Sequence, residues 1–457
     1  MNRRDFLKMT ALSTFALGCG CQSGRKDPAD SRPNVLFIVI DDLNDWVGCL
    51  GGNPDSLTPN MDRLAAKGTL FRNAYASSPL CGPSRAAFLS GMRASTTGLY
   101  DNLSNFEDHQ ILLDYENLPQ FLRRRGYLAY GAGKVFHGYY PQYWDDSIDK
   151  GGRLYQAGEP KKNGLDIPGI FDWGALDVPD EQMDDYRMAQ FAIDKLSQEH
   201  EKPFFLACGI YLPHVPYYAP RAYFDKFPLD KLSMPVVKAD DTADLPKEAI
   251  KVINPKYTEF IDKCGQDKLK EAVQAYLACV NFADAQVGRV LDALEQSPYA
   301  HNTIVVLLGD NGLHFGEKNK WHKDSLWAES SRVPFMIYDP RKNRNGKLCD
   351  RVVSLLDIYP TLAELTNSLP PSNLEGRSIV PLLEYPYRKW DYPAITNRRK
   401  DQTAVRTEKW CYIRYQDGTE ELYDYETDRF EWYNLASDGK YTNIKTKLAA
   451  YIPPNQV

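Results

Sequence analysis

Two short polar segments each follow an apolar run long enough to form a buried strand. Asp41 and Asp42 come directly after one run, and Asp310 and Asn311 come after another. An open parallel sheet gathers its ligands at the carboxyl ends of its strands. Adjacent carboxylates repel unless a cation lies between them, and carboxylate and amide oxygens suit Ca²⁺ or Mg²⁺ rather than zinc. The pattern therefore predicts one divalent-cation site, although an acidic turn after a strand is also common.

A third segment, Cys-Gly-Pro-Ser-Arg at residues 81–85, precedes an apolar run that ends at Gly91. Pro83 is well placed for the first turn of a helix, so Cys81 is expected at the helix N-terminus. Unpaired backbone N–H groups there favour an anion. Taken alone, the cysteine would more safely be interpreted as a buried residue in a turn.

The sequence Cys-x-Pro-Ser-Arg, followed by such a helix, resembles the signature of the type I sulfatases, members of the alkaline-phosphatase-like superfamily. Residues 34–42 resemble the opening strand of these enzymes, and the likeness extends to about residue 435. It implies that Cys81 is converted to formylglycine, whose hydrated aldehyde supplies the nucleophilic oxygen. It also implies Ca²⁺ in preference to Mg²⁺, with the modified Cys81 as an additional ligand. Arg85 would orient the modified residue and offset its negative charge.

Two further motifs resemble the iduronate-2-sulfatase branch of the family. The motif Lys-Val-Phe-His ends at His137, and Pro-His-x-Pro contains His214. By resemblance, Lys134 would hold formylglycine or sulfate oxygens, and His137 would deprotonate the geminal hydroxyl. His214 would contact sulfate and protonate the leaving alcohol. Asn311 stands where this branch usually has histidine, which weakens the transfer of its substrate.

Residues 316–323 resemble the family segment that supplies the last sulfate-binding lysine. Its register favours Lys323, with Lys320 as the alternative, and Lys318 occupies a position where many relatives have histidine. His314 and His322 are expected at the periphery or at the substrate edge rather than on the metal.

Apolar runs that alternate with helical patterns predict an α/β fold with a mostly parallel sheet. The resemblance refines this to an alkaline-phosphatase-like large mixed sheet flanked by helices, with a smaller C-terminal antiparallel subdomain. We expect a catalytic domain over residues 31–368 and an α+β subdomain over residues 369–457. Strands are predicted at 34–40, 127–131, 204–210 and 303–308, helices at 59–64, 118–125, 179–199, 268–295 and 357–365, and a hairpin over 410–425.

Residues 1–30 predict an export signal rather than part of the fold. Arg3 and Arg4 precede a modest apolar run in a pattern that resembles the twin-arginine signal, and this run is too short to cross a bilayer. Cys19 lies in an imperfect lipoprotein box. We expect a periplasmic protein or a membrane-anchored lipoprotein, with membrane contact only through the signal or a lipid on Cys19.

Seven cysteines follow this segment without metal-like spacing. One or two disulfides could form in an oxidising compartment. Cys208 and Cys279 lie in apolar stretches and are expected in the core.

The net charge of −6 provides no general attraction to polyanions, so nucleic acid is excluded as a partner. The resemblance implies a sulfated oligosaccharide substrate, from a uronic-acid-containing glycosaminoglycan or an algal polysaccharide, and a formylglycine-generating maturation enzyme as a partner. Two alternatives stay open. One is a phosphonate or phosphodiester hydrolase of the same superfamily, and the other is a catalytically silent, glycan-binding surface lipoprotein.

Overall fold

The computed structural model describes residues 32–149, 161–165, 171–253, 255–342 and 346–454. Residues 32–457 form one compact unit. The predicted export signal and Cys19 lie outside the described residues. In the described part of the chain, no helix is both long enough and apolar enough to span a membrane.

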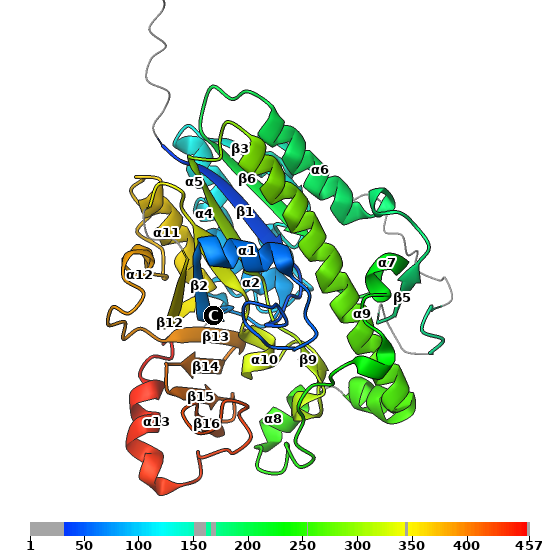
Figure 1. Cartoon of the computed structure of the whole chain (residues 1–457). Coiled ribbons are helices and arrows are strands. Elements are labelled where there is room, and N and C mark those ends of the chain that lie inside the picture. The colour runs from blue at the N-terminus through cyan, green and yellow to red at the C-terminus, as the bar shows by residue number, and fades with distance from the viewer. Residues whose placement is uncertain (1–31, 150–160, 166–170, 254, 343–345, 455–457) are drawn as a thin grey trace, which may run out of the picture. The chain divides into compact units, whose positions relative to one another are not determined.

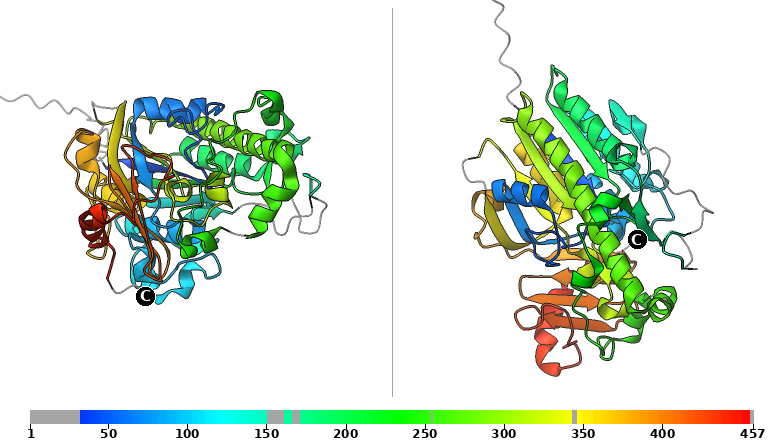
Figure 2. Two further views of the ribbon diagram at one scale, coloured as in Figure 1. Left: turned by 90° about the horizontal axis from the view of Figure 1, so that it is seen from below. Right: turned by 45° about the vertical axis from the view of Figure 1, so that its right-hand side comes forward.

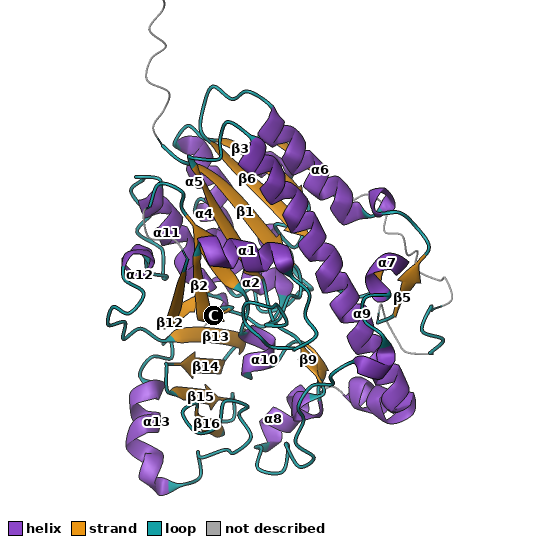
Figure 3. Ribbon diagram, in the orientation of Figure 1, coloured by secondary structure: helices purple, strands orange, loops and turns teal. Residues whose placement is uncertain are grey.

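An eight-stranded sheet forms the centre of this unit (Figure 3), in the order β12-β2-β11-β8-β1-β6-β3-β4. Of these eight strands, β11 alone runs against the others, because it pairs antiparallel with β2 and β8 while all other pairs are parallel. The strands are β1 Asn34–Ile40, β2 Thr69–Tyr75, β3 Leu128–Gly133, β4 Asp146–Ile148, β6 Phe204–Ile210, β8 Thr303–Gly309, β11 Phe335–Tyr338 and β12 Lys347–Ser354.

The register of the central strands brings their carboxyl ends to one level. Ile40, the last residue of β1, pairs with Gly309 of β8 on one side and with Ile210 of β6 on the other. The residues that follow these three strands therefore emerge side by side. This edge of the sheet is where a parallel α/β fold collects its functional groups.

Side chains along β1 alternate between two apolar layers, as the two-residue period of a strand requires. Leu36 and Ile38 pack with residues of α1, α6 and α9, whereas Val35 and Phe37 pack with residues of α2, α5, α11 and α12. Figures 1 and 2 show these helices around the sheet. Burial on both faces explains why the central strands are continuously apolar. The helices are α1 Pro59–Lys67, α2 Cys81–Ser90, α3 Ala94–Thr97, α4 Gln110–Asp114, α5 Leu118–Arg124, α6 Asp184–Ser197, α7 Arg221–Phe224, α8 Lys247–Val252, α9 Pro255–Gln296, α10 Ala328–Ser331, α11 Ile358–Leu365, α12 Val380–Glu384 and α13 Thr442–Ala449.

A second, four-stranded antiparallel sheet lies near the C-terminus, in the order β13-β14-β15-β16. One face packs against Trp327 and α8, and the other face packs against α13. Trp327 follows Lys323 by four residues, so this sheet supports the segment that carries that lysine. The strands are β13 Ala394–Arg399, β14 Gln402–Arg406, β15 Trp410–Arg414 and β16 Glu420–Asp424. The division at residue 368 stays a prediction.

The predicted fold class is confirmed, and the four predicted strands and the C-terminal hairpin are present. The helix expected from residue 179 begins at Asp184, after a short 3₁₀ turn, and α9 begins earlier than expected, with a break at Gly265 where φ is +68°. Strands β2, β11, β12 and β13 were not foreseen. Two small sheets complete the fold: β5 Trp173–Leu176 with β7 Tyr217–Pro220, and β9 His314–Phe315 with β10 Trp321–His322.

Within the described residues all seven cysteines are free thiols, so none of the disulfides that the sequence allowed is formed. Cys208 lies on β6 and Cys279 lies on α9. Both are fully buried in the same apolar layer, as expected.

Candidate active site

The acidic segments lie at the ends of neighbouring strands. Asp41 and Asp42 follow β1, and Asp310 and Asn311 follow β8. Oxygens of the three carboxylates lie within 4.8 Å of one another, and all three side chains are buried. The backbone N–H groups of Asp42 and Asn311 both donate to Asp310 Oδ1 at 2.9 Å. We call these four residues the acidic floor.

The oxygen atoms of the acidic floor suit a hard divalent cation. In the described structure, Asp42 Oδ2 and Asn311 Oδ1 are buried and accept no hydrogen bond. A buried polar atom without a partner costs free energy unless another ligand satisfies it. Carboxylate and amide oxygens that converge in this way fit Ca²⁺ or Mg²⁺. The predicted metal-binding residues are thus brought together.

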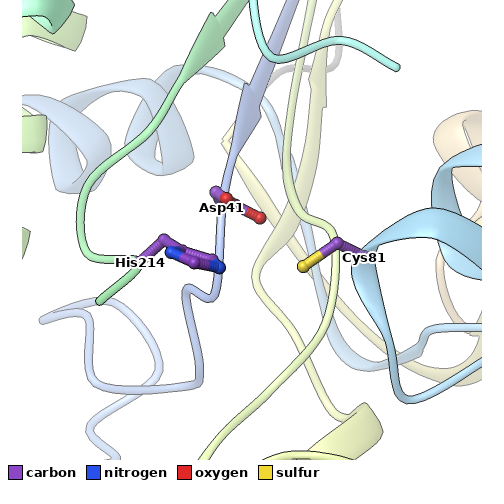
Figure 4. A group of neighbouring side chains, drawn as sticks. All are labelled: Asp41, Cys81 and His214. Atoms are coloured by element: carbon purple, nitrogen blue, oxygen red, sulfur yellow. The ribbon is translucent and has the colours of Figure 1, made fainter. Parts of the chain in front are cut away.

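Cys81 is the first residue of α2, and its thiol points at the acidic floor. Lys323 Nζ donates to Cys81 Sγ at 2.6 Å and also to Asp42 Oδ1, while the sulfur lies 3.6 Å from the same oxygen. Figure 4 shows Asp41, Cys81 and His214 pointing toward one another. Burial and the charge of Asp41 raise the pKa of the Cys81 thiol well above its usual value, although Lys134 and Lys323 act in the opposite direction. The unmodified thiol is therefore a weak nucleophile.

Arg85, one turn further along α2, is fully buried. Its Nε donates to Asp310 Oδ2 at 2.8 Å and its Nη2 donates to Asp41 Oδ1 at 3.2 Å. Its Nη1 donates to the backbone carbonyls of Lys134 and Val135. The hydrogen bonds from Nε and Nη2 thus reach the acidic floor. Arg85 thus holds two acids of the floor in place, and its expected role of orienting the modified residue 81 stays a prediction.

Lys134 follows β3 and forms an ion pair with Asp41. The backbone around it is crowded: a Cβ on Gly209 of β6 would lie 2.3 Å from the carbonyl carbon of Lys134. Gly133 has a φ of +65°, and a Cβ there would lie 2.2 Å from Gly209 O. These two glycines allow β3 and β6 to deliver Lys134 beside the acidic floor.

The two predicted histidines also lie at this site. His214 follows β6, and its Nε2 is 3.9 Å from Asp42 Oδ2. Its Nδ1 lies 2.6 Å from the carbonyl of Val215 and must donate there, because a carbonyl only accepts. Nε2 is then free to exchange a proton. His137 lies next to the start of α2, since a Cβ on Gly82 would be 3.5 Å from His137 Cγ.

Burial and the positive charge of Lys134 lower the pKa of both histidines, to about 4 for His214 and about 3 for His137. Burial opposes the ionisation of Asp42, but Lys323 and His214 bring its pKa down to about 2. Burial raises the pKa of Asp310 to about 7 despite the Arg85 guanidinium. A cation at the acidic floor would favour the ionised form of Asp310.

The choice between the two candidate lysines is decided by geometry. Lys323 contacts Cys81, whereas Lys320 Nζ donates to the carbonyl of Val252 at 2.9 Å. Lys318 is buried and pairs with Asp241 at 2.6 Å. Lys320 and Lys318 therefore hold the fold around the active site, and Lys323 is the lysine that reaches it.

His314 does not belong to the groups of described side chains that could hold a metal ion, as expected, but it is not at a substrate edge either. Its side chain is fully buried, between Ser325 Oγ at 2.8 Å and the carbonyl of Glu317 at 3.2 Å. His322 is only partly buried, and its pKa is lowered to about 3 by burial and by the neighbouring Lys323.

Residues 33–368 match the Sulfatase family model, and residues 316–456 match the family described as N-sulphoglucosamine sulphohydrolase, C-terminal. The chain belongs to the sulfatase family. It is therefore a sulfuric ester hydrolase, and membership of this family implies formylglycine and a metal ion.

Similar proteins cover most of the chain. A sulfatase of Formosa agariphila is 38% identical over 92% of this chain and 86% of its own length. Iduronate 2-sulfatase of Mus musculus is 30% identical over 78% of this chain and 74% of its own length. Among solved structures, phosphonate monoester hydrolase of Agrobacterium radiobacter matches with a TM-score of 0.78 at 21% identity, over 92% of this chain and 94% of the other. At that identity the structural likeness shows the fold alone.

Several residues around the active site of this sulfatase escaped sequence analysis. Asn102 Oδ1 accepts the backbone N–H of Gly82 at 2.8 Å and so caps α2 beside Cys81. The Tyr276 hydroxyl, on α9, donates to the carbonyl of Asp42 at 2.8 Å. Asp185, on α6, accepts two backbone N–H groups from the segment after β6. Asn102 and Tyr276 lack a sequence signal, and Asp185 looks like an ordinary acid in the first turn of a helix.

Proposed function

We propose that this sulfatase removes sulfate from a sulfated, uronic-acid-containing oligosaccharide, of the kind found in glycosaminoglycans or algal polysaccharides. The observation that carries the catalytic part is the position of Cys81, whose sulfur lies 2.6 Å from Lys323 Nζ and 3.6 Å from Asp42 Oδ1. A nucleophile at residue 81 would lie beside the ammonium group of Lys323 and beside the acidic oxygens of the predicted cation site. The carbohydrate part is supported by the 30% identity to mouse iduronate 2-sulfatase and by the Lys134 and His214 motifs.

The residues of the site are chemically suited to both groups that the family implies, formylglycine and a divalent cation. Formylglycine made from Cys81 would supply, as its hydrate, an oxygen nucleophile in place of the protonated thiol. A Ca²⁺ ion, held by Asp41, Asp42, Asp310, Asn311 and the modified residue 81, would supply positive charge close to the sulfate oxygens. The buried oxygens of Asp42 and Asn311 that accept no hydrogen bond in the described structure are the observation that favours this ligand set.

The residues of the chain neutralise and position the sulfate. Lys134 follows β3 and pairs with Asp41, and Lys323 follows β10 and pairs with Asp42. Both ammonium groups lie beside the acidic floor and would bind sulfate oxygens. Arg85 acts through Asp41 and Asp310, which it holds in place. Fixed charges of this kind stabilise developing negative charge without having to reorganise during the reaction.

The two histidines would move protons. His214 Nε2 faces the site and would protonate the departing sugar alcohol, while His137 would accept a proton from residue 81 when sulfate is released. The low pKa of His214 reflects burial and the positive charge of Lys134. A bound sulfate ester is anionic and would oppose the effect of Lys134, so the imidazole gains its proton when substrate is present.

The experiment must also distinguish two alternative functions. A phosphonate or phosphodiester substrate is suggested by the fold of the Agrobacterium radiobacter enzyme, but the family match and the 38% identical relative favour sulfate. A silent glycan-binding protein would be expected to lack part of the catalytic set. Here the motif residues converge on one site.

We also propose that the protein is exported, because Arg3 and Arg4 precede an apolar run in the twin-arginine pattern. Its maturation enzyme would have to meet Cys81 before that residue is buried. Cys19 remains the candidate for lipidation.

The test is release of inorganic sulfate from a panel of sulfated oligosaccharides by protein matured in its native host. Cys81→Ala should abolish release, because no nucleophile can form at position 81. Cys349→Ala is the matched control: this buried cysteine lies on β12, at the far edge of the sheet, and its variant should retain turnover. If the matured wild type releases no sulfate but cleaves a phosphonate ester, the sulfate assignment is wrong. If it binds sulfated sugars without cleaving either ester, the protein is a binding module.

A further inference from the structure

Asp185 is a buried carboxylate that none of the catalytic motifs contains. It lies in the first turn of α6, and its side chain is only 3% exposed. Asp185 Oδ1 accepts the N–H of Tyr211 at 2.7 Å, and Oδ2 accepts the N–H of Leu212 at 2.9 Å. Both oxygens thus hold consecutive peptide groups of the segment that leads from β6 to His214.

This segment leaves the sheet at the two residues whose N–H groups donate to Asp185. Ile210 is the last residue of β6, and its carbonyl still accepts the N–H of Asp41 at 3.0 Å. Beyond Ile210 the pairing to β1 and β3 ends, so the next N–H groups need other acceptors. Asp185 provides both of them and fixes the direction in which the chain turns.

His214 is connected to this anchor through a single turn. The N–H of His214 donates to the carbonyl of Tyr211 at 2.9 Å, so the two peptides held by Asp185 begin the turn that His214 closes. The Tyr211 ring also lies 5.4 Å from Lys134 Nζ. A shift of residues 211–212 would therefore move His214 Nε2 relative to the leaving group and disturb the surroundings of Lys134.

We propose that Asp185 is a positioning residue for the reaction, which fixes the Tyr211–His214 turn so that the His214 imidazole reaches the leaving oxygen. This inference rests on the proposed role of His214 as the acid for the departing alcohol. Asp185 itself does not touch the sulfate.

Asp185 is buried in the same part of the protein as two other acids. The charges that act on it most strongly, Asp184 and Asp41, are both negative. Burial raises the pKa of Asp185 to about 7, even though the Leu212 and Tyr211 N–H groups lower it. Two acceptor oxygens are needed to hold both peptides, and asparagine of the same size offers only one. In Asp185→Asn, one of these two backbone N–H groups should therefore lose its acceptor. It would instead face the side-chain NH₂ group of asparagine, which is also a donor.

The experiment compares two substrates that need different amounts of acid assistance. A sugar sulfate releases a poor leaving group that needs a proton, whereas 4-nitrophenyl sulfate releases a phenolate that needs little help. For Asp185→Asn, turnover of the sugar sulfate should fall about tenfold or more, within the range that acid catalysis contributes. Turnover of the aryl sulfate should fall by a clearly smaller factor.

A double-mutant cycle with His214 separates positioning from general damage. If Asp185 acts through His214, adding Asp185→Asn to His214→Ala should cost little further activity toward the sugar sulfate, because the effects of coupled residues do not add. If the two losses multiply, or if both substrates slow by the same factor, the proposal is wrong.

Asp284→Asn is the matched control for a buried aspartate that accepts two backbone N–H groups. Asp284 accepts the N–H of Met61 at 2.8 Å and the N–H of Asn60 at 3.2 Å, at the start of α1 rather than beside His214. Its variant should leave the ratio of the two turnover rates unchanged, and a changed ratio would overturn the proposal. Melting temperatures of both variants show whether either has lost its fold. A matured wild type that hydrolyses neither sulfate would instead defeat the proposed function.

Discussion

The two sides of the active site are held in place in different ways. Asp41, Asp42, Asp310 and Asn311 directly follow paired parallel strands, so the ladder between β1 and β8 sets their positions. Lys323 follows the two-residue strand β10, which pairs only with the equally short β9. The comparison indicates that the acidic floor is fixed by backbone pairing, whereas the position of Lys323 depends on a few buried contacts and is easier to displace.

Those buried contacts come from distant parts of the chain. Lys318 Nζ pairs with Asp241, from the loop before α8, and donates to the carbonyl of Glu431. The Glu431 side chain in turn accepts the N–H of Ala328 at 2.9 Å. The segment after β16 and the loop before α8 thus hold the Lys323 segment between them.

The largest effect is expected from Asp310→Asn, which weakens the acidic floor. This change removes a negative charge that both Arg85 and the proposed cation require, while the neighbouring ladder stays intact. Turnover should fall by about 10³-fold, because a metal ion contributes several kcal/mol of charge stabilisation. Bound calcium, measured by elemental analysis, should fall in parallel. A variant that is fully active and binds its usual calcium would contradict the ligand set.

Lys323→Ala should cost somewhat less, about 10²-fold to 10³-fold in turnover, the usual loss when one preorganised charge is removed. Calcium content should stay close to that of the wild type, because the acidic oxygens remain. Lys320→Ala provides the matched control, since Lys320 Nζ donates to the carbonyl of Val252 and not to the site. An equal loss of turnover in both variants would show that the segment matters only for folding.

The smallest effect on turnover is expected when the Lys318–Asp241 pair is broken. This change tests most directly whether buried side-chain contacts hold the segment that carries Lys323. Lys318→Ala leaves Asp241 buried without its partner and should lower the free energy of unfolding by about 3 to 5 kcal/mol. Turnover by the protein that stays folded should drop only modestly, through displacement of Lys323. Chemical denaturation gives the first quantity, and turnover per folded molecule gives the second. Lys318→Met combined with Asp241→Leu should recover much of the stability.

The sequence predicts the acidic floor well because its residues directly follow long apolar strands. It also predicts Cys81 and Lys134, since each lies in a compact motif. Register alone favours Lys323 over Lys320, because the two lysines are three residues apart and differ only in what they reach after folding. Asn102, Asp185 and Tyr276 act through contacts with residues 20 to more than 200 positions away, and the identity of a residue does not reveal such a partner. Strand β11 is short and antiparallel, and its apolar residues could equally have formed a turn of helix.

The most direct test of the account measures sulfate release against the fraction of residue 81 converted to formylglycine. Protein made with increasing amounts of the maturation enzyme provides the series, and mass spectrometry of the peptide that contains residue 81 gives the converted fraction. The account predicts that turnover rises in proportion to conversion and extrapolates to zero for unmodified Cys81. Substantial turnover by protein with an intact cysteine, or turnover that does not follow conversion, would contradict it.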